Sequence, residues 1–328
     1  MTATPRPGGA AGFWQRVRRA VADYPAIVLI LILILLIIGT DIASPGFVTP
    51  SQLSTTLLYA APLGILAAGQ TLVLLTGGID LSVAGTATAA AYLLAGLGGL
   101  GAVPAIILAL LLGLAVGLVN GIGVGIFGVQ PLIMTLGMAG IITGALALAA
   151  LGFTNGVPTV PDAIHQLGSG TVLGLVPVNL FVWAPIALLL TVGLRRSGFG
   201  RMVYAVGDNP LACRLAGVRV WQVLLATYTL CGVLGAVAGL LFVGATNAAD
   251  QNLANPYLLP SVAAAVIGGT SILGGSGGYG GTILGALILT VLDSLLNILS
   301  MPEAIKQMLY GLIVLALAAV YVRTSGGE

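Results

Sequence analysis

The sequence predicts an all-α polytopic membrane protein with about ten transmembrane helices, some of them broken at glycines. Three observations support this fold class. Charged residues make up 6% of the 328 residues, whereas a soluble domain contains roughly 25%. Hydrophobic residues make up 58% of the chain, which is more than a soluble core could keep from water. Apolar runs of about 20 residues, the length that crosses a bilayer, recur along the whole chain.

Ten apolar segments, separated by polar or Gly/Pro clusters, are the expected transmembrane helices. In chain order they cover residues 25–44, 53–76, 82–98, 103–127, 131–151, 177–194, 220–246, 257–273, 282–299 and 306–322. They form one transmembrane domain over 25–322, expected to be preceded by a cytoplasmic segment (1–24) and followed by a cytoplasmic tail (323–328). The first apolar run resembles a signal peptide, but it has no small-residue cleavage site, and we expect an uncleaved anchor.

The basic residues predict the orientation of the chain. With an even number of spans, ten of them fall on one side: Arg6, Arg16, Arg18, Arg19, Arg195, Arg196, Arg201, Arg214, Arg219 and Arg323. The positive-inside rule makes that side the cytoplasm, so both termini are expected inside and only Lys306 outside. The tryptophans are expected at membrane interfaces, because they lie near predicted helix ends: Trp14, Trp183 and Trp221.

The segment TGGIDLS, residues 76–82, places a carboxylate between two apolar runs. Gly77 and Gly78 are expected to end one helix, and Asp80 would cap the next by accepting from the amide of Ser82 or Val83. An ionisable group in a membrane is also costly unless it faces a water-filled cavity, and broken helices mark transport sites. Both interpretations remain open, and they are compatible.

Polar residues in or beside the spans are candidates for a substrate pathway. The set comprises Gln70, Thr76, Asp80, Ser82, Asn120 and Asn297. For Asn120 a hydrogen bond between helices is an equally good interpretation. Asp293 and Gln307 are weaker pathway candidates, and a second glycine-rich break is expected within 267–281.

Four glycines recur at every fourth position in the expected helix 103–127: Gly113, Gly117, Gly121 and Gly125. This spacing makes a smooth stripe on one face, which favours close contact with a neighbouring helix. We interpret the stripe as a packing surface.

No catalytic or metal-binding pattern is found in the sequence. GSGGYG, residues 275–280, matches G-x-G-x-x-G, but no strand precedes it and the surrounding residues form an apolar segment interrupted by glycines. There is no GK[ST] motif, so the chain is not expected to hydrolyse ATP. His165 has no companions at metal-ligand spacing, and Cys213 and Cys231 are interpreted as small apolar fillers. No enzyme activity, metal or cofactor is expected.

The longest charged segment, residues 195–219, is expected to lie on the cytoplasmic side and to contain a short amphipathic helix. Asp208 and Asn209 before Pro210 form a helix start signal, and Gly217 is a stop signal. Such a helix can be a basic interfacial segment. Alternatively, it docks a cytoplasmic partner.

Four stretches resemble the permease subunit of ribose-type ABC importers: LTGGIDLSVAGT, GVQPLIMTLGM, GRMVYAVGDNPLACRLAGV and AVIGGTSILGGSGGYGGTILGALIL. The resemblance extends from about residue 44 to the C-terminus. The sequence departs from the family pattern at Ala84 and Asp208, where glycine is common. The resemblance implies a coupling helix seated in an ATPase, made of Gly207, Asp208, Asn209, Pro210, Arg214, Leu215 and Gly217.

The resemblance also implies partners: a second permease subunit, identical or paralogous, two cytoplasmic ATP-binding subunits, and an extracytoplasmic sugar-binding protein. We therefore expect the translocation pathway of an importer in the bacterial cell membrane, without a nucleic-acid partner. The spans offer amides and hydroxyls but no cationic cluster for phosphate, so a small neutral sugar is expected, selected mainly by the binding protein. The alternative is an ion-coupled secondary transporter in which Asp80 or Asp293 carries a proton.

Overall fold

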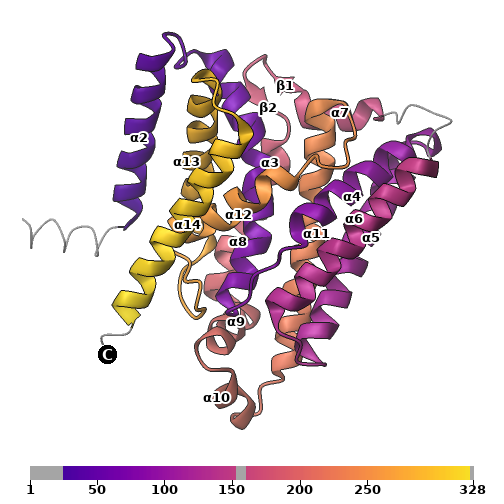
Figure 1. The fold of residues 1–328 in the computed structure, drawn as a ribbon, viewed down its shortest axis with the longest axis vertical. Helices are drawn as coiled ribbons and strands as arrows, with labels where there is room; N and C mark the ends of the chain where they lie inside the picture. Colours follow the sequence, from indigo (N-terminus) through magenta and orange to yellow (C-terminus); the bar gives the residue numbers. More distant parts are fainter. Residues whose placement is uncertain (1–24, 153–159, 326–328) are drawn as a thin grey trace, which may run out of the picture.

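The computed structural model describes residues 25–152 and 160–325. The expected cytoplasmic segment 1–24, with its four arginines and Trp14, lies outside the described residues, as do residues 326–328. The described chain is a bundle of helices with one short β-hairpin (Figure 1).

Each of the ten expected segments overlaps one helix. They are α2 (Pro25–Ala43), α3 (Pro50–Leu75), α4 (Val83–Gly96), α5 (Ala102–Gly125), α6 (Pro131–Gly152), α8 (Leu180–Arg196), α11 (Val220–Thr246), α12 (Leu258–Ile267), α13 (Tyr279–Ile298) and α14 (Glu303–Ser325). Within the described ranges, six helices are long and apolar enough to cross a membrane: α2, α3, α5, α6, α11 and α13. The all-α membrane class is confirmed, and ten crossings stay a prediction.

The remaining elements are short and connect the long helices. They are η1 (Gly98–Leu100), α7 (Asp162–Ser169), β1 (Thr171–Val172), β2 (Val176–Pro177), α9 (Gly198–Asp208), α10 (Pro210–Leu215) and η2 (Asn255–Tyr257). The two strands pair antiparallel, with Thr171 opposite Pro177. α8 and α9 are bent by 70° relative to each other and together are apolar enough for one further span. α4 and α12 are apolar but shorter.

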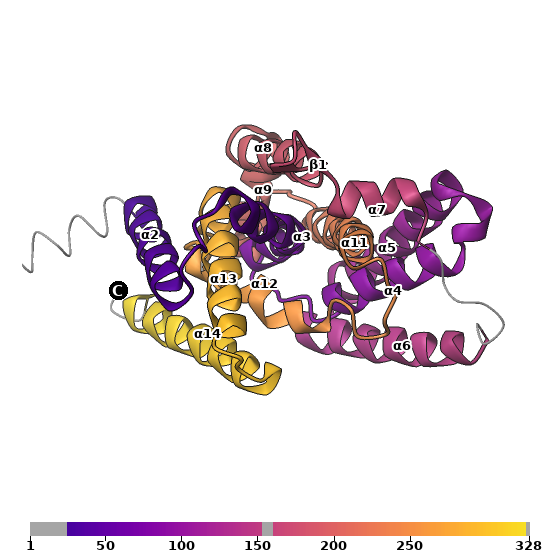
Figure 2. The same cartoon turned by 90° about the horizontal axis from the view of Figure 1, so that it is seen from above.

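α3 is the central helix of the bundle, and every residue from Ala60 to Leu75 is buried. Seen from above, α2 and α14 lie on one flank and α5 and α6 on the other, with α11, α12 and α13 around α3 (Figure 2). Small residues in α3 allow this close packing, because lipid supplies no hydrophobic force between helices and contact must come from backbone approach.

The two breaks in the chain end their helices in the same way. At the end of α3, the amides of Gly77 and Gly78 donate to the carbonyls of Leu74 and Val73, at 2.8 and 3.1 Å. At the end of α12, the amide of Gly269 donates to Val266 at 2.9 Å in the same pattern. Gly77 and Gly269 have φ of +78° and +88°, the left-handed conformation that glycine adopts without steric cost.

Two expectations from sequence are wrong in detail. The helix expected over 257–273 ends at Ile267, because the left-handed Gly269 terminates it, and a loop follows over residues 268–278. Trp183 does not present its ring at the surface of the bundle, as an interfacial tryptophan would: only 5% of its surface is exposed, and its Nε1 donates to the hydroxyl of Tyr279 at 2.7 Å. Its indole lies against Gly64, where the absence of a side chain makes room inside the bundle.

The described arginines before Arg323 gather at one end of the bundle, where α9 and α10 lie (Figure 1). The C-terminal end of α14 points to the same end. α7, the β-hairpin and the turn between α13 and α14 lie at the opposite end. This arrangement agrees with the expected separation of charge, and the sidedness in a membrane stays a prediction.

Candidate functional site

Asp80 lies in the break between α3 and α4 and is only 1% exposed. Its Oδ1 accepts from the backbone amide of Ser82 at 2.8 Å and from the Ser82 hydroxyl at 2.6 Å. The carboxylate therefore satisfies an amide at the start of α4, as the capping interpretation expects. The amide and the hydroxyl both approach one oxygen, and this holds the loop in a fixed turn.

Gln70 and Asn120 join this turn to two helices. The Nε2 of Gln70 on α3 donates to the carbonyl oxygen of Asp80 at 2.6 Å. The Nδ2 of Asn120 on α5 donates to the hydroxyl of Ser82 at 2.8 Å. The structure thus brings together four of the six predicted pathway residues in one buried network. None of these four lines any of the three cavities described below, which are formed by residues of the described part of the chain.

Sequence reasoning missed two threonine contacts at the breaks. Thr135 of α6 accepts from the amide of Leu81 at 3.1 Å and lies 3.2 Å from the carbonyl oxygen of Ile79. The hydroxyls of Thr71 on α3 and Thr282 on α13 are 2.8 Å apart. A single threonine in an apolar helix has no local signature, because its hydroxyl can satisfy itself on the preceding turn. Only the packing of helices distant in sequence reveals these contacts.

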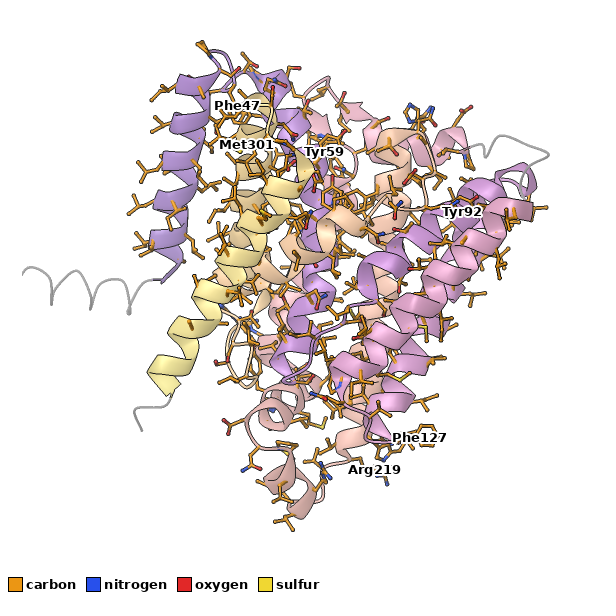
Figure 3. All side chains as sticks on the ribbon, in the orientation of Figure 1. Phe47, Tyr59, Tyr92, Phe127, Arg219 and Met301 are labelled. Carbon is orange, nitrogen blue, oxygen red and sulfur yellow. The ribbon has the colours of Figure 1, made fainter. Side chains whose placement is uncertain are left out.

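Two adjoining cavities, of about 300 and 490 Å³, lie at the end of the bundle opposite α10. Figure 3 places Phe47 and Tyr59 at this end and Arg219 at the other. Five residues line both cavities: Tyr59, Tyr257, Thr290, Asp293 and Asn297. Of the predicted pathway residues, Asn297 is thus the one that lines these two cavities.

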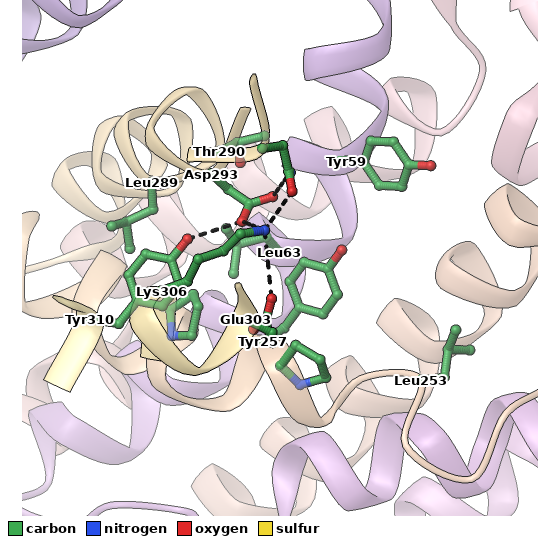
Figure 4. Close-up of a pocket in the computed structure, with 13 residues that line it drawn as sticks. Tyr59, Leu63, Leu253, Tyr257, Leu289, Thr290, Asp293, Glu303, Lys306 and Tyr310 are labelled. Atoms are coloured by element: carbon green, nitrogen blue, oxygen red, sulfur yellow. Dashed lines mark hydrogen bonds and ion pairs between the residues drawn. The ribbon is translucent and has the colours of Figure 1, made fainter. Parts of the chain in front are cut away.

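A charged cluster forms one wall of the smaller cavity (Figure 4). The Nζ of Lys306 lies 3.1 Å from Asp293 Oδ1 and 3.6 Å from Glu303 Oε2, and it donates to Asn297 Oδ1 at 2.5 Å. Asp293 also accepts from the Tyr310 hydroxyl at 3.1 Å and from Asn297 Nδ2 at 2.9 Å. α13 and α14 bring these groups together. The sequence signal that could have revealed this cluster is the opposite charge of Asp293 and Lys306, which lie on two consecutive predicted helices.

A third cavity, of about 250 Å³, lies near α10, between the first break and the start of α6. Thr76, Pro131, Pro210, Arg214 and Tyr228 are among its lining residues. Thr76 is the predicted pathway residue that lies here, and Pro210 and Arg214 belong to the predicted coupling segment. The break therefore borders on the coupling segment through this cavity.

α10 is the short helix that the start and stop signals predicted. Asn209 Oδ1 accepts from the amide of Ala212 at 2.9 Å and caps the first turn. Gly217, at φ +83°, follows the last turn, and its amide donates to the carbonyl of Arg214 at 3.0 Å. Leu211 and Leu215 are 63% and 83% exposed. The preceding helix α9 has no counterpart in the sequence-based expectation.

The end of α9 touches both breaks through backbone atoms. Gly207 packs against the carbonyl oxygen of Leu75, and a methyl group on it would lie 2.6 Å from the amide of Gly275. The Gly275 amide donates to the Leu75 carbonyl at 3.0 Å. Asp208 follows Gly207 at the end of α9 and is exposed. Three segments thus meet at Gly207 without an intervening side chain.

The glycine stripe of α5 faces α11. A methyl group on Gly113 or Gly117 would lie 2.5 Å from the carbonyl oxygens of Gly232 and Tyr228. The remaining two contacts are of the same kind, with Gly121 against Leu225 and Gly125 against Trp221. Within residues 25–152 and 160–325, no three acidic, histidine or cysteine side chains lie close enough to hold a metal ion.

The long apolar helices, the two glycine-rich breaks and the polar cavities define a multi-pass membrane protein, from which the capped helix α10 projects at one end. Residues 52–318 match the family described as "Branched-chain amino acid transport system / permease component". The ribose import permease protein of Escherichia coli (strain K12) is 35% identical over 300 residues, covering 89% of this chain and 91% of the relative.

Two further relatives are similar over most of their length. The autoinducer 2 import system permease protein of Enterobacter sp. (strain 638) is 34% identical, covering 85% of this chain and 88% of the relative. The ribose import permease protein of Bacillus subtilis (strain 168) is 33% identical, covering 86% and 88%. No solved structure matches. The chain therefore belongs to this permease family, as an ABC permease of the ribose and autoinducer-2 import type in the bacterial inner membrane.

Proposed function

We propose that this chain forms the translocation pathway of an ABC importer for a small neutral sugar. In this proposal it pairs with a second permease subunit, binds two cytoplasmic ATP-binding subunits and receives the sugar from an extracytoplasmic binding protein. The observation that carries the proposal is α10: a capped helix with exposed Leu211 and Leu215, projecting from a chain of this family. An exposed apolar helix that ends a bundle is suited to docking.

The contacts of Gly207 support a role of α10 in coupling. α9 is continuous with α10 except for the cap residue Asn209, and its end packs on the backbones of both breaks. A displacement of α10 by closing ATPases would therefore reach the end of α3 and the loop that follows α12 directly through backbone contacts, with no flexible side chain between them to absorb the movement. Densely packed interfaces transmit such displacements because they deform little.

The buried network supports a structural role for the break at Asp80. We propose that Gln70, Asp80, Ser82 and Asn120 hold the end of α3 and the start of α4 at a constant angle. Thr76 and Asn297 would contact the passing substrate, because they line cavities at opposite ends of the bundle. The glycine stripe would let α5 and α11 move as one unit, since it leaves no gap between their backbones.

A neutral substrate suits the charges around the cavities. Lys306 is the only cation among the described residues that line the two cavities opposite α10, and it is already paired with Asp293 and Glu303. An anionic ligand would need unpaired cations. Hydroxyls and amides, which suit a sugar, make up the rest of the polar lining.

The ion-coupled alternative requires a carboxylate that exchanges protons with water. Asp80 is buried and accepts hydrogen bonds from the amide and the hydroxyl of Ser82. Asp293 is paired with Lys306 at 3.1 Å. A proton carrier would have to break these contacts in each cycle, which favours the ABC proposal.

Reconstitution in proteoliposomes tests the proposal against this alternative. The complete complex should take up D-ribose, or another neutral sugar from a panel, only with ATP and the binding protein. The chain alone should show no uptake under a proton or sodium gradient. Gradient-driven uptake by the chain alone would reject the ABC proposal, and the complex with an ATPase-dead partner serves as control.

A further inference from the structure

We propose that the two cavities opposite α10 form a sugar-binding site within the permease itself, in which Asp293, oriented by its ion pair with Lys306, accepts hydrogen bonds from the hydroxyl groups of a neutral monosaccharide. This inference rests on the proposed function and deepens it, because selection is otherwise assigned mainly to the binding protein. The site would recognise the sugar a second time, after its delivery.

The cavities have the size of a small-molecule site. Their volumes of about 300 and 490 Å³ fall in the range of roughly 300–1,000 Å³ that ligand pockets occupy. They share the five lining residues named above, so one ligand can contact both. The walls come from α3, η2, α13 and α14, which are separate elements in the sequence (Figure 4).

Asp293 keeps hydrogen-bonding capacity for a ligand. Its side chain is 39% exposed while that of Lys306 is 7% exposed, so the pair presents its carboxylate rather than its ammonium to the cavity. Oδ2 accepts only from Asn297 among the described residues, and a carboxylate oxygen has room for two donors. Sugar hydroxyls can donate hydrogen bonds, and they match a carboxylate oxygen that still has room for a donor.

Two tyrosines supply free hydroxyls and aromatic faces. Neither Tyr59 nor Tyr257 donates a hydrogen bond from its hydroxyl to another described residue, and both line the two cavities. Figure 4 shows Tyr257 beside the charged cluster and Tyr59 across from it. The negative face of an aromatic ring attracts C–H edges, and one side of a pyranose or furanose ring presents such edges.

The local charge selects against phosphorylated sugars. The cluster contains one cation, Lys306, and two carboxylates, Asp293 and Glu303, so its formal sum is one negative charge. The ammonium already has three partners within 3.6 Å. A phosphate would meet repulsion from the carboxylates and find no free donor of opposite charge. If the ion pair served only to hold α13 and α14 together, it would not require an exposed carboxylate and unpaired tyrosine hydroxyls at the same cavity.

Protection of an engineered thiol tests the site in the assembled complex. Ser294 lines the larger cavity, and Ser294→Cys would be labelled by a membrane-impermeant maleimide. Thr171→Cys, exposed on β1 at the same end and outside both cavities, is the control. D-ribose, D-galactose and D-ribose 5-phosphate are the probes. Uptake of the same sugars with ATP is measured in parallel.

We expect one neutral sugar to slow labelling of Ser294→Cys about tenfold at ten times its Kd, with no change for Thr171→Cys. D-ribose 5-phosphate should not protect. Adding Tyr59→Phe, which keeps the ring and leaves the ion pair intact, should weaken protection several-fold without changing the melting temperature. Adding Asp293→Asn and Lys306→Met together should abolish protection.

Each result separates this site from the proposed function. ATP-driven uptake without any protection by the transported sugar would overturn the site and leave the proposed function standing. Equal protection by D-ribose 5-phosphate, or full protection in the Asp293→Asn/Lys306→Met variant, would also overturn the site. Protection by a neutral sugar with no uptake by the complete complex would support the site and reject the proposed function.

Discussion

Gly207, near the end of α9, lies directly against the carbonyl oxygen of Leu75, the last residue of α3. The contact joins the predicted coupling segment to the helix that occupies the centre of the bundle. Because it is made by backbone atoms, it depends on the absence of a side chain at residue 207.

Gly207→Ala should destabilise the chain and reduce coupling. Its methyl group has no space beside Leu75 and Gly275, and overpacking of this kind costs about 1–3 kcal/mol. We expect a lower melting temperature in detergent and less ATP-driven uptake per assembled complex. Gly198→Ala on the same helix is the control, because its methyl group would find only Arg201 at 3.8 Å. Equal melting temperatures for the two variants would contradict the prediction.

Gly117→Ala should separate α5 from α11. The methyl group would lie 2.5 Å from the carbonyl oxygen of Tyr228, so one helix must shift, at a cost of about 1–3 kcal/mol. Gly144→Ala on α6 has open space around it and should leave the melting temperature unchanged or raise it, since alanine favours helix. Thermal unfolding of both variants measures the difference. A stable Gly117→Ala protein would argue against a packing role for the stripe.

Replacement of Asp80 should separate capping from proton transfer. Asp80→Asn retains an oxygen that can accept from Ser82, so it should keep its fold and most of its ATP-driven uptake. Asp80→Ala leaves the buried Ser82 amide without this acceptor and should lose about 1–3 kcal/mol of stability. Folded yield and uptake are the measurements. Loss of all uptake in a well-folded Asp80→Asn protein would revive the ion-coupled alternative.

Leu215→Asp should weaken binding of the ATP-binding subunit. The side chain is 83% exposed on α10, so a charge there would disturb an apolar contact more than the fold. Leu173→Asp, at a position 92% exposed in the β-hairpin at the other end, is the matched control. Co-purification with the ATPase should fall for Leu215→Asp alone. Replacement of residues 210–214 by a Gly/Ser linker should have the same effect while the chain stays membrane-inserted.

A double-mutant cycle on Asp293 and Lys306 should reveal their coupling. Lys306→Met removes the partner of a half-buried carboxylate, and we expect a loss of about 1–3 kcal/mol, reduced from fully buried pairs because Asp293 is partly exposed. Asp293→Asn combined with Lys306→Met should recover part of this loss, since no unpaired charge remains. Strictly additive changes in the free energy of unfolding would show that the 3.1 Å contact contributes nothing.

Local signals predicted much of the fold. The apolar runs located the ten apolar helices, Gly77 marked the end of α3, and the capping signal at Asn209 and Pro210 marked the start of α10, whereas α7 and α9 were not predicted. The same reasoning placed Trp183 at an interface, because a tryptophan near a predicted helix end favours that position. Trp183 is instead buried against Gly64, and no local sequence pattern predicts a contact between residues so far apart in the chain.

The sequence indicated individual residues of the candidate site but not their arrangement. Asp293, Asn297 and Lys306 were each noticed in the sequence, but their common cavity depends on how α14 rotates against α13. Asp80 was a candidate for the pathway and for a helix cap, and Asn120 for the pathway and for a hydrogen bond between helices. The structure places both in a buried network away from the three cavities described above. Periodicity reports which residues share a helix face, and it leaves open which neighbour that face meets.

The sequence by itself determined that this chain is a membrane protein. It also determined the residues at which its helices begin and break, and the segment that forms the exposed helix α10. These properties follow from hydropathy and from backbone preferences of glycine, proline and asparagine, which act over a few neighbouring residues. Only the tertiary structure decided that Lys306 meets Asp293 and that Gly207 meets Leu75. Such contacts join residues on different helices, and the packing of whole side-chain surfaces selects them.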